Sequence, residues 1–145
     1  MDFLTGMRVS ASGMTAQRMR MNAISSNIAN VNTTRTPEGG AYRRKEVVFG
    51  AMPQQRNFGE ILAGKVHNDI DRVQVVDIRP DRSGPLMKYD PGHVDANEDG
   101  YVAYPKINVM EEMVDMIQAS RAYEANVSAM NTSKNMALSA LEIGR

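Results

Sequence analysis

Apolar residues recur at alternating spacings of three and four in two stretches of the chain, residues 2–31 and residues 108–143. This spacing places them along one side of an α-helix, as in helices that pack lengthwise against one another. The positions on the two lines, seven of nine apolar in each, are Phe3, Met7, Ser10, Met14, Gln17, Met21, Ile24, Ile28 and Val31, and then Met113, Met116, Ser120, Tyr123, Val127, Met130, Lys134, Ala137 and Leu141. The pattern predicts a long helix at each end of the chain, packed against other helices.

The other faces of the second predicted helix carry few charges. Between residues 113 and 143, the charged residues are Asp115, Arg121, Glu124, Lys134 and Glu142, and many of the other positions hold Ala, Ser, Asn or Thr. A helix with one solvated face shows charges on that face. We therefore expect this helix to contact several neighbouring molecules; the alternative is an ordinary two-helix hairpin with an uncharged surface.

The ends of both predicted helices can be placed. Pro37 follows a run of Asn and Thr residues and ends the first helix near residue 31. Asn108 is a favourable N-cap for the second helix, and Glu111 stands three residues later, as a capping box requires. The second helix is expected to end at Gly144.

The middle of the chain, residues 42–105, has the character of short strands. Runs rich in β-branched and aromatic residues predict strands over 42–49, 72–78, 86–89 and 101–104, and a further short element of unassigned type over 60–63. Pro, Gly, Asp and Ser residues form the turns between them. A segment of this size buries little apolar surface by itself, so we expect it to lean on the helices or on neighbouring molecules.

Together these elements predict an α+β fold, mainly α, in which long N- and C-terminal helices pair as an antiparallel coiled coil beside a small β-rich middle segment. The expected divisions are residues 1–35 and 106–145 for the two helices of a helical core and residues 36–105 for the middle with its extended loops. Antiparallel pairing lets the middle fold compactly at one end and opposes the helix dipoles. Full overlap sets Phe3 near Leu141 and Val31 near Met113.

Composition excludes several classes of protein. Lys and Arg number 17, as do Asp and Glu, so the balanced charge does not indicate a nucleic-acid-binding protein. The absence of cysteine excludes disulfides, thiol nucleophiles and cysteine-ligated zinc. No stretch reaches the roughly 20 apolar residues of a membrane span, and the N-terminus lacks the apolar run of a secretory signal.

Methionine is abundant, with 12 residues that fall mostly in the helical stretches. Their flexible side chains suit irregular contacts better than a thioether metal site.

Candidate catalytic groups are sparse. The two histidines, His67 and His93, each precede an acid by two residues, Asp69 and Asp95, but no third ligand or nucleophile stands at a readable spacing. We expect no catalytic residue. The basic run 43–45 is followed by Glu46 and is interpreted as the solvated end of a strand.

One segment resembles a calcium-binding loop. Residues 95–100, DANEDG, match the first six positions of an EF-hand loop. The twelfth position should be a bidentate Glu and is Lys106, and Pro91-Gly92 precludes a preceding helix. We expect a turn in which Asp and Asn side chains bond to the backbone, with no metal and no cofactor.

Two groups of residues carry a resemblance to a known family. SNIAN at 26–30, followed by Asn32-Thr33 and Thr36-Pro37, resembles the N-terminal signature of flagellar rod and hook proteins. DPGHVDANEDGYV at 90–102 leads into Asn108, EMVDMI at 112–117 and SRAYEANV at 120–127, and this half is most similar to the proximal-rod proteins. The resemblance covers about 90 residues, and the chain departs from the expected pattern at Gly92, Val94 and Asn97.

The resemblance implies a structural subunit of the flagellar basal-body rod. Such a subunit polymerises through its terminal helices into the drive shaft that transmits torque from motor to hook and filament, and it is needed for motility. The implied partners are other copies of the chain, other rod proteins, adjacent basal-body components and, during secretion, the flagellar type III export apparatus, with the rod crossing the periplasm. Residues expected at assembly interfaces are Phe3, Met7, Met14, Met21, Ile24, Ile28, Val31, Met113, Met116, Tyr123, Val127, Met130, Ala137 and Leu141.

Three other hypotheses stay open at this point. A soluble helical adapter or export chaperone would keep its terminal helices folded without partners. A calcium-binding module would fold in a calcium-dependent way, and an enzyme would organise a pocket around His67 or His93.

Overall fold

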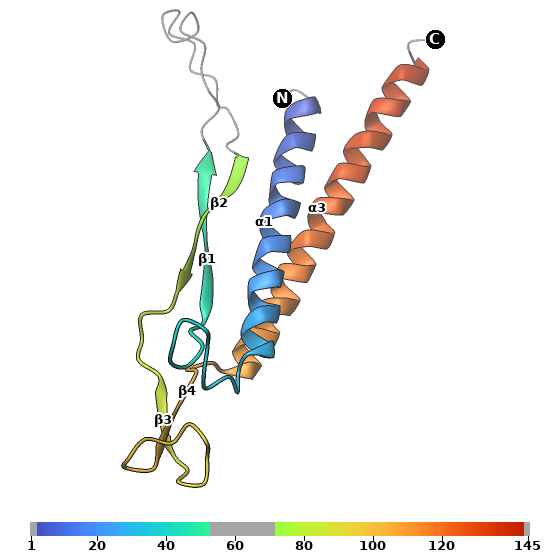
Figure 1. Cartoon of the computed structure of the whole chain (residues 1–145). Helices are drawn as coiled ribbons and strands as arrows, with labels where there is room; N and C mark the ends of the chain where they lie inside the picture. Colours follow the sequence, from blue (N-terminus) through green and yellow to red (C-terminus); the bar gives the residue numbers. More distant parts are fainter. Residues whose placement is uncertain (1–2, 53–71, 144–145) are drawn as a thin grey trace, which may run out of the picture.

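The computed structural model describes residues 3–52 and 72–143 of the 145-residue chain. In chain order the elements are helix α1 (Phe3–Ala29), strands β1 (Lys45–Met52), β2 (Arg72–Pro80), β3 (Leu86–Tyr89) and β4 (Tyr101–Tyr104), and helix α3 (Val109–Ile143). The strands form two separate antiparallel pairs, β1 with β2 and β3 with β4. The predicted α+β class, with two long helices and a small β-rich middle, is confirmed (Figure 1).

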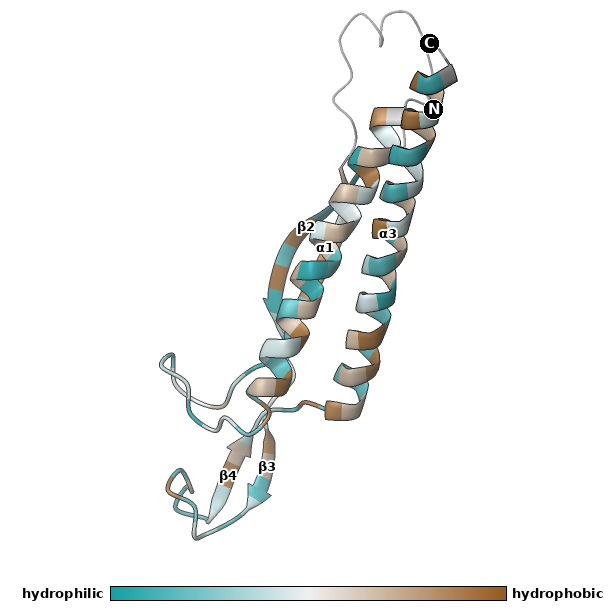
Figure 2. Cartoon of the chain, turned by 90° about the vertical axis from the view of Figure 1, so that its right-hand side faces the viewer, coloured by the Kyte–Doolittle hydropathy of each residue, from teal (hydrophilic) through white to brown (hydrophobic). Residues whose placement is uncertain are grey.

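Helices α1 and α3 lie side by side with both chain ends at the same end of the pair (Figures 1 and 2). Gly13 lies opposite Asn126 in the middle of α1, and Asn27 hydrogen-bonds to Glu112 near its end. The residue numbers of the contacting positions therefore fall along α3 as they rise along α1. Because α3 has 35 residues and α1 has 27, the last turns of α3 extend past the start of α1.

The expected register between the helices is wrong. Full overlap would set Asn27 opposite Ile117 and Gly13 opposite Asn131, whereas Asn27 meets Glu112 and Gly13 meets Asn126. The register is fixed by the polar bonds of Asn27 at one end of the pair, and not by matching the lengths of two apolar lines.

The start of α3 follows the prediction in its main feature. Asn108 Oδ1 accepts a hydrogen bond from the backbone N–H of Met110 at 3.1 Å, as an N-cap does. Glu111 is exposed, and within the described part of the chain its side chain makes no return bond to Asn108. The acidic residues Glu111 and Glu112 in the first turn suit the positive end of the helix dipole.

Helix α1 ends at Ala29, two residues before the predicted boundary. Asn30 is responsible, because its side-chain amide donates to the carbonyl of Ser26 at 2.8 Å and so binds a last-turn carbonyl. Thr33 N–H then donates to the carbonyl of Asn30, which closes a turn. Val31 consequently lies in this turn and not in the helix.

The longer hairpin lies along α1. Strands β1 and β2 pair from Lys45 opposite Pro80 to Met52 opposite Arg72, with an irregularity between Val48 and Phe49. Ser12 Oγ on α1 accepts a hydrogen bond from the N–H of Val73 at 3.2 Å. Figure 1 shows α1 in the middle, with this hairpin on one side and α3 on the other.

The strand predictions are confirmed for three of the four strands. Strands 86–89 and 101–104 have the predicted bounds, and 72–78 extends two residues further to Pro80. The first strand begins at Lys45 and not at residue 42, because the preceding residues are bound to the helices. The predicted element at 60–63 lies outside the described residues.

The short β3–β4 hairpin projects from the end of the molecule opposite the two termini (Figure 1). Tyr89 and Tyr101 face each other across it, with ring centroids 5.3 Å apart in an edge-to-face arrangement. Gly100 has a φ of +80°, and a Cβ there would lie 2.9 Å from the Tyr89 ring, so glycine is required in this turn. Val102 in β4 is fully buried.

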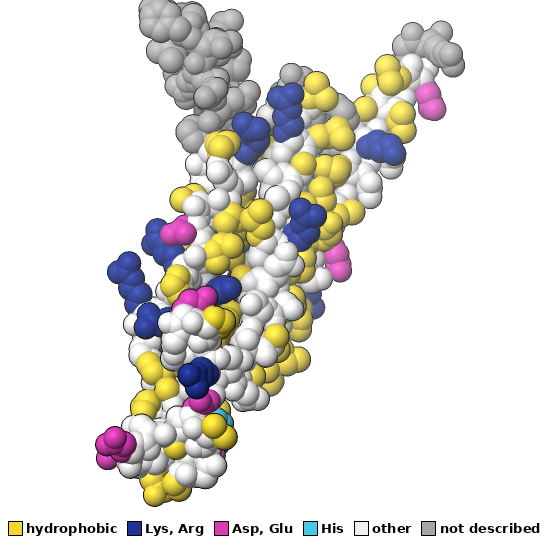
Figure 3. Space-filling model, viewed as in Figure 1, with side chains coloured by type: hydrophobic (Ala, Val, Ile, Leu, Met, Phe, Trp, Pro, Cys, Tyr) yellow, Lys and Arg dark blue, Asp and Glu magenta, His cyan; other side chains and the backbone are white. Residues whose placement is uncertain are grey.

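The buried apolar core is small. In the described part of the chain, the buried apolar residues are Ala16, Ala23, Ile24, Val102 and Ala119. Three of the five are alanines, which bring backbones close but bury little surface. Figure 3 shows hydrophobic side chains spread over the visible faces of the helices, and Figure 2 shows hydrophobic and hydrophilic bands alternating along α3. Large exposed apolar patches mark contact surfaces.

Gly13 provides a test of the helix contact. An added Cβ at Gly13 would lie 2.9 Å from Asn126 Oδ1, whereas one at Gly6 would meet nothing within 4 Å. Gly6→Ala should raise the free energy of unfolding by about 0.5–1 kcal/mol, because alanine favours the helix. Gly13→Ala should lose that gain or reverse it, because Asn126 is held by its own bond to the carbonyl of Ala122 at 2.8 Å.

Chemical unfolding followed by circular dichroism measures both variants. Adding Asn126→Ala to Gly13→Ala should recover the helix-propensity gain, since the obstructing amide is removed. Equal stabilisation by the two glycine substitutions would show that α1 and α3 are not in close contact at Gly13.

Candidate functional site

The only fully buried polar residues of the described chain with large side chains, Asn27 and Glu112, meet where α1, β1 and α3 converge. Each is 1% exposed. Asn27 Nδ2 donates to Glu112 Oε2 at 2.9 Å and to the carbonyl of Lys45 at 3.0 Å. Asn27 Oδ1 accepts from the N–H of Lys45 at 2.8 Å and from the Tyr42 hydroxyl at 3.1 Å. All four hydrogen-bonding positions of the amide are therefore used.

Glu112 is held by a cation as well as by Asn27. The guanidinium of Arg44 donates through Nε to Glu112 Oε1. Burial lowers the pKa of Arg44, but its hydrogen bond to Glu112 and the charges of Glu112 and Asp115 outweigh burial and leave the pKa raised. Arg20 on α1 extends the group by donating to Asp115 Oδ1 at 3.0 Å. A buried carboxylate without these partners would cost several kcal/mol.

We call Asn27, Glu112, Arg44, Asp115 and Arg20 the polar junction. It joins the end of α1, the segment before β1 and the first turns of α3. Each bond depends on side chains from different parts of the sequence, so the junction fixes the register of α3 against α1 and the start of β1 together. The interpretation of residues 43–45 as a solvated strand end is wrong for Arg44, whose side chain is only 31% exposed and bound to two carboxylates.

Residues on both sides of Asn27 extend this junction. Ser26 Oγ lies 3.2 Å from the Tyr42 hydroxyl. Thr34 Oγ1 donates to Asp95 Oδ2 at 2.8 Å, which ties the segment after α1 to the loop between β3 and β4. The residues that carry the sequence resemblance therefore hold the lower half of the molecule together.

The apolar line of α1 is placed mostly inward. Met7, Met14, Met21 and Ile28 are partly buried, and Ile24 is 4% exposed. Phe3 begins α1, and its side chain lies outside the description.

The residues of α3 that face α1 differ from the predicted line. At every second position of that line, the residue that faces α1 comes one place earlier in the sequence. Glu112 and Ala119 are buried, at 1% and 0% exposure, and Asn126 contacts Gly13. These positions stand next to the predicted Met113, Ser120 and Val127. Small or hydrogen-bonding side chains let the two backbones approach, which the larger apolar residues would prevent.

The predicted α3 residues accordingly divide into two sets. Five of them are partly buried in the single chain: Met116, Tyr123, Val127, Met130 and Ala137. Met113 is 50% exposed and Leu141 is 72% exposed. These two side chains are therefore largely uncovered by the described part of the chain.

The loop that resembles an EF-hand is an ordinary turn in this structure. Asn97 Oδ1 accepts from the N–H of Tyr101 at 2.7 Å, and Asp95 N–H donates to His93 Nδ1 at 3.1 Å. The Asp95 carboxylate is bonded to Thr34. Within residues 3–52 and 72–143 no group of three acidic or histidine side chains could hold a metal ion. His67 and Asp69 lie outside the described residues.

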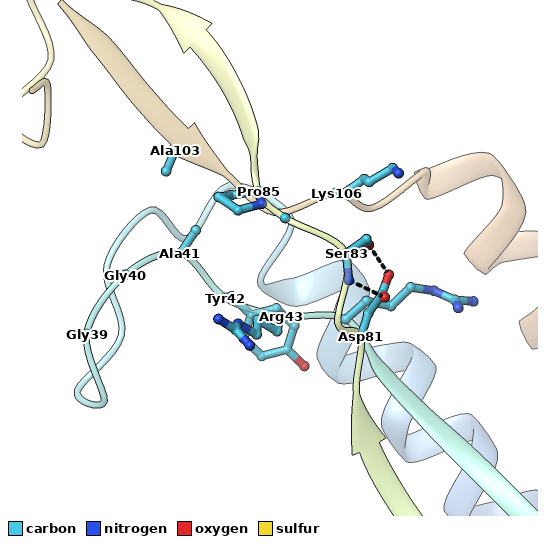
Figure 4. A pocket seen from close by; sticks show the side chains of 12 residues that line it. Gly39, Gly40, Ala41, Tyr42, Arg43, Asp81, Ser83, Pro85, Ala103 and Lys106 are labelled. Carbon is cyan, nitrogen blue, oxygen red and sulfur yellow. Dashed lines mark hydrogen bonds between the residues drawn. The ribbon is translucent and has the colours of Figure 1, made fainter. Parts of the chain in front are cut away.

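A small cavity of about 160 Å³ lies between the Gly39-Gly40 loop and the connection from β2 to β3 (Figure 4). Ser83 donates to Asp81 through its N–H at 2.8 Å and through its hydroxyl, and these bonds lower the pKa of Asp81. Lys106 also lines the cavity. Both bonds join residues two apart in the connection from β2 to β3, so they close a turn.

In the described part of the chain, neither helix is long and apolar enough to cross a membrane.

Comparison with known proteins identifies the family. The family described as flagella basal body rod protein matches residues 7–35, and the flagellar basal body rod FlgEFG protein C-terminal family matches residues 98–143. The flagellar basal-body rod protein FlgC of Borreliella burgdorferi is 46% identical, with 99% of this chain and 98% of that protein covered. The protein of the same name from Bacillus subtilis is 42% identical, with 96% of this chain and 96% of that protein covered. The one from Salmonella typhimurium is 34% identical, with 94% of this chain and 94% of that protein covered.

The chain belongs to the FlgC family of flagellar basal-body rod proteins. This is a family of structural proteins, not of enzymes. The two matched segments contain most of α1 and α3 and the residues of the polar junction other than Arg44. The resemblance inferred from the sequence motifs is confirmed.

Sequence reasoning did not find the polar junction. Asn27 and Glu112 each stood within a recognised motif, but neither had an assigned partner. The sequence did offer one signal. A line drawn one residue earlier on α3 passes through Glu112, Ala119 and Asn126, which form the inner face.

The polar junction predicts a large effect from one amide. Asn27→Ala removes the partner of the buried Glu112 Oε2 and of the Lys45 N–H and carbonyl, and it should lower the free energy of unfolding by about 2–4 kcal/mol. Asn22→Ala is the matched control, because Asn22 is exposed on the same helix and its loss should change stability by about 0.5 kcal/mol or less. Urea unfolding measures both, and similar midpoints for the two variants would contradict the assigned role of Asn27.

Proposed function

We propose that this chain is a structural subunit of the flagellar proximal rod and that it polymerises through α1 and α3. Family membership supports the rod assignment. The proposal that assembly proceeds through the helices is supported by the exposure of apolar side chains on α3. In the single chain Met136 is 59% exposed, Leu138 is 51% exposed and Leu141 is 72% exposed.

In the register that sets Gly13 opposite Asn126, Met136 lies opposite Phe3, and Leu138 and Leu141 lie past the start of α1. No partner within the described chain covers them, and solvated apolar side chains contribute nothing to the stability of a lone helix. Residues 131–143 also contain only two charged side chains, Lys134 and Glu142. A helix of this composition is suited to burial among other helices and not to solvent on all sides.

Within the chain, we propose that α1 and α3 pair as an antiparallel coiled coil over their shared length. The alternating spacing of the inner α3 positions, with Glu112, Ala119 and Asn126 interleaved with Met116 and Tyr123, supports this packing. The assembly residues then fall into two roles. The partly buried set stabilises the pair, and Met113 and Leu141 contact neighbouring molecules.

In this proposal, the 1–35 and 106–145 segments form the helical core of the rod, and 36–105 forms the β-rich middle around it. The subunit is exported by the flagellar type III apparatus and assembles in the rod that crosses the periplasm. There it contacts its own copies, other rod proteins and adjacent basal-body components, and it transmits torque from motor to hook and filament.

Leu138→Glu tests assembly through α3. Leu138 is exposed in the single chain and glutamate is a good helix former, so folding of the isolated chain should be nearly unchanged. In the rod, the buried and unpaired carboxylate should cost several kcal/mol, so the chain should be absent from basal bodies and the cells should not swim.

Arg82→Glu is the control, because Arg82 is exposed in the connection between β2 and β3, away from the helices. Immunoblots of isolated basal bodies and a swimming assay give the result. Motile cells with normal amounts of the Leu138→Glu chain in their basal bodies would contradict assembly through this face. An unsubstituted chain found only in the cell body, and never in basal bodies, would instead favour the adapter or chaperone hypothesis.

A further inference from the structure

A compact apolar patch covers the first two turns of α3 on the side away from α1. Its members are Met110, Met113, Val114 and Ile117, which are 69%, 50%, 52% and 52% exposed. They follow the spacing i, i+3, i+4, i+7, which gathers them into one ridge. Figure 3 shows hydrophobic side chains along this lower edge of α3. We call these four residues the α3 ridge.

An apolar groove lies elsewhere on the same chain, between α1 and the β1–β2 hairpin. Its volume is about 710 Å³, and its lining comprises Met19, Asn22, Ala23, Ser26, Lys45, Ile78 and Pro80. Met19 is 39% exposed and Ile78 is 47% exposed. We call this the hairpin groove.

The two features agree in length. The α3 ridge runs from residue 110 to 117 and the α1 wall of the hairpin groove from residue 19 to 26, so each covers eight residues, or about 10 Å of helix from first to last. A helix with a two-turn apolar ridge fits a groove of the same length, as amphipathic helices do in helix-in-groove recognition.

The charges at their borders are opposite. Glu111 is exposed beside the α3 ridge, whereas Lys45 lines the hairpin groove and Arg18 is exposed on α1 one turn before Asn22. Among the described residues, none of these three side chains forms a salt bridge. Contact between the ridge and the groove would bring the acidic border to the basic one.

We propose that the α3 ridge of one copy docks in the hairpin groove of a second copy. This rests on the proposed function, since it names the surfaces through which copies meet. The contact is heterologous, because each copy offers the ridge at one side and the groove at another, and such contacts extend into rings or open helical assemblies instead of closing a dimer. Pairing of two ridges would close a dimer and leave both grooves empty.

Cysteine crosslinking tests the contact, because the chain has no native cysteine. Cells would carry Met113→Cys and Ile78→Cys in one chain as their only copy, and isolated basal bodies would be oxidised and resolved without reductant. The expected result is a ladder of disulfide-linked species from the double variant, while each single variant stays monomeric. Val114→Cys with Pro80→Cys reports the same contact if the first pair disturbs assembly.

The controls separate the outcomes. Glu124→Cys with Ile78→Cys keeps the cysteine in the hairpin groove. It places the α3 cysteine two turns beyond the end of the α3 ridge, so this variant should crosslink far less. Dimers from Met113→Cys alone would show that two ridges pair, and basal bodies that contain both double variants without crosslinks would also overturn the proposal while leaving the rod function intact. Absence of even the unsubstituted chain from basal bodies would instead be a failure of the rod function.

Charge reversal supplies an independent readout. Lys45→Glu and Glu111→Lys should each lower the amount of chain retained in basal bodies roughly two- to fivefold, as expected for a surface ion pair. The two changes in one chain should restore retention. A double variant no better than either single variant would contradict the proposed contact.

Discussion

The fold of this chain depends on the burial of one carboxylate. Glu112 is 1% exposed at the start of α3, and it is tolerated there because Asn27 and Arg44 hold both of its oxygens. Asn27 in turn bonds both the N–H and the carbonyl of Lys45, which opens β1. The two helices and the start of the hairpin therefore meet in one cluster of side chains that bind one another. The penalty for leaving a buried charge unpaired makes this arrangement specific.

Away from the polar junction, little holds the helices together. The described core consists largely of alanines, and Gly13 lets α1 approach Asn126 closely. Leu138 and Leu141 lie on the far turns of α3, where no described element covers them. We propose that a rod subunit with this design is specified by its polar junction and completed by its neighbours. In this proposal, contacts with neighbours also account for the exposed apolar residues of the α3 ridge and of the hairpin groove.

The sequence was sufficient for the elements and insufficient for their register. The spacing of apolar residues predicted both helices, and short runs with β-branched or aromatic residues between turns predicted β2, β3 and β4, because these signals are local. The motifs at 26–37 and 90–127 also indicated the correct family. The register required knowing that Asn27 and Glu112 bond across 85 positions, and no local signal carries that information. Apolar spacing placed Met113 on the inner line, whereas the need to pair Glu112 turned Met113 outward.

Hydrogen–deuterium exchange along the two helices of the isolated chain tests this account most directly. Amides slow to exchange are those whose opening is costly, so protection maps local stability. The account predicts strong protection around residues 23–29 and 109–119, next to the polar junction. It also predicts fast exchange toward residue 4 of α1 and residue 141 of α3, where packing is sparse. Uniform strong protection along both helices in the dilute monomer would contradict the claim that the junction specifies the fold and that neighbours complete it.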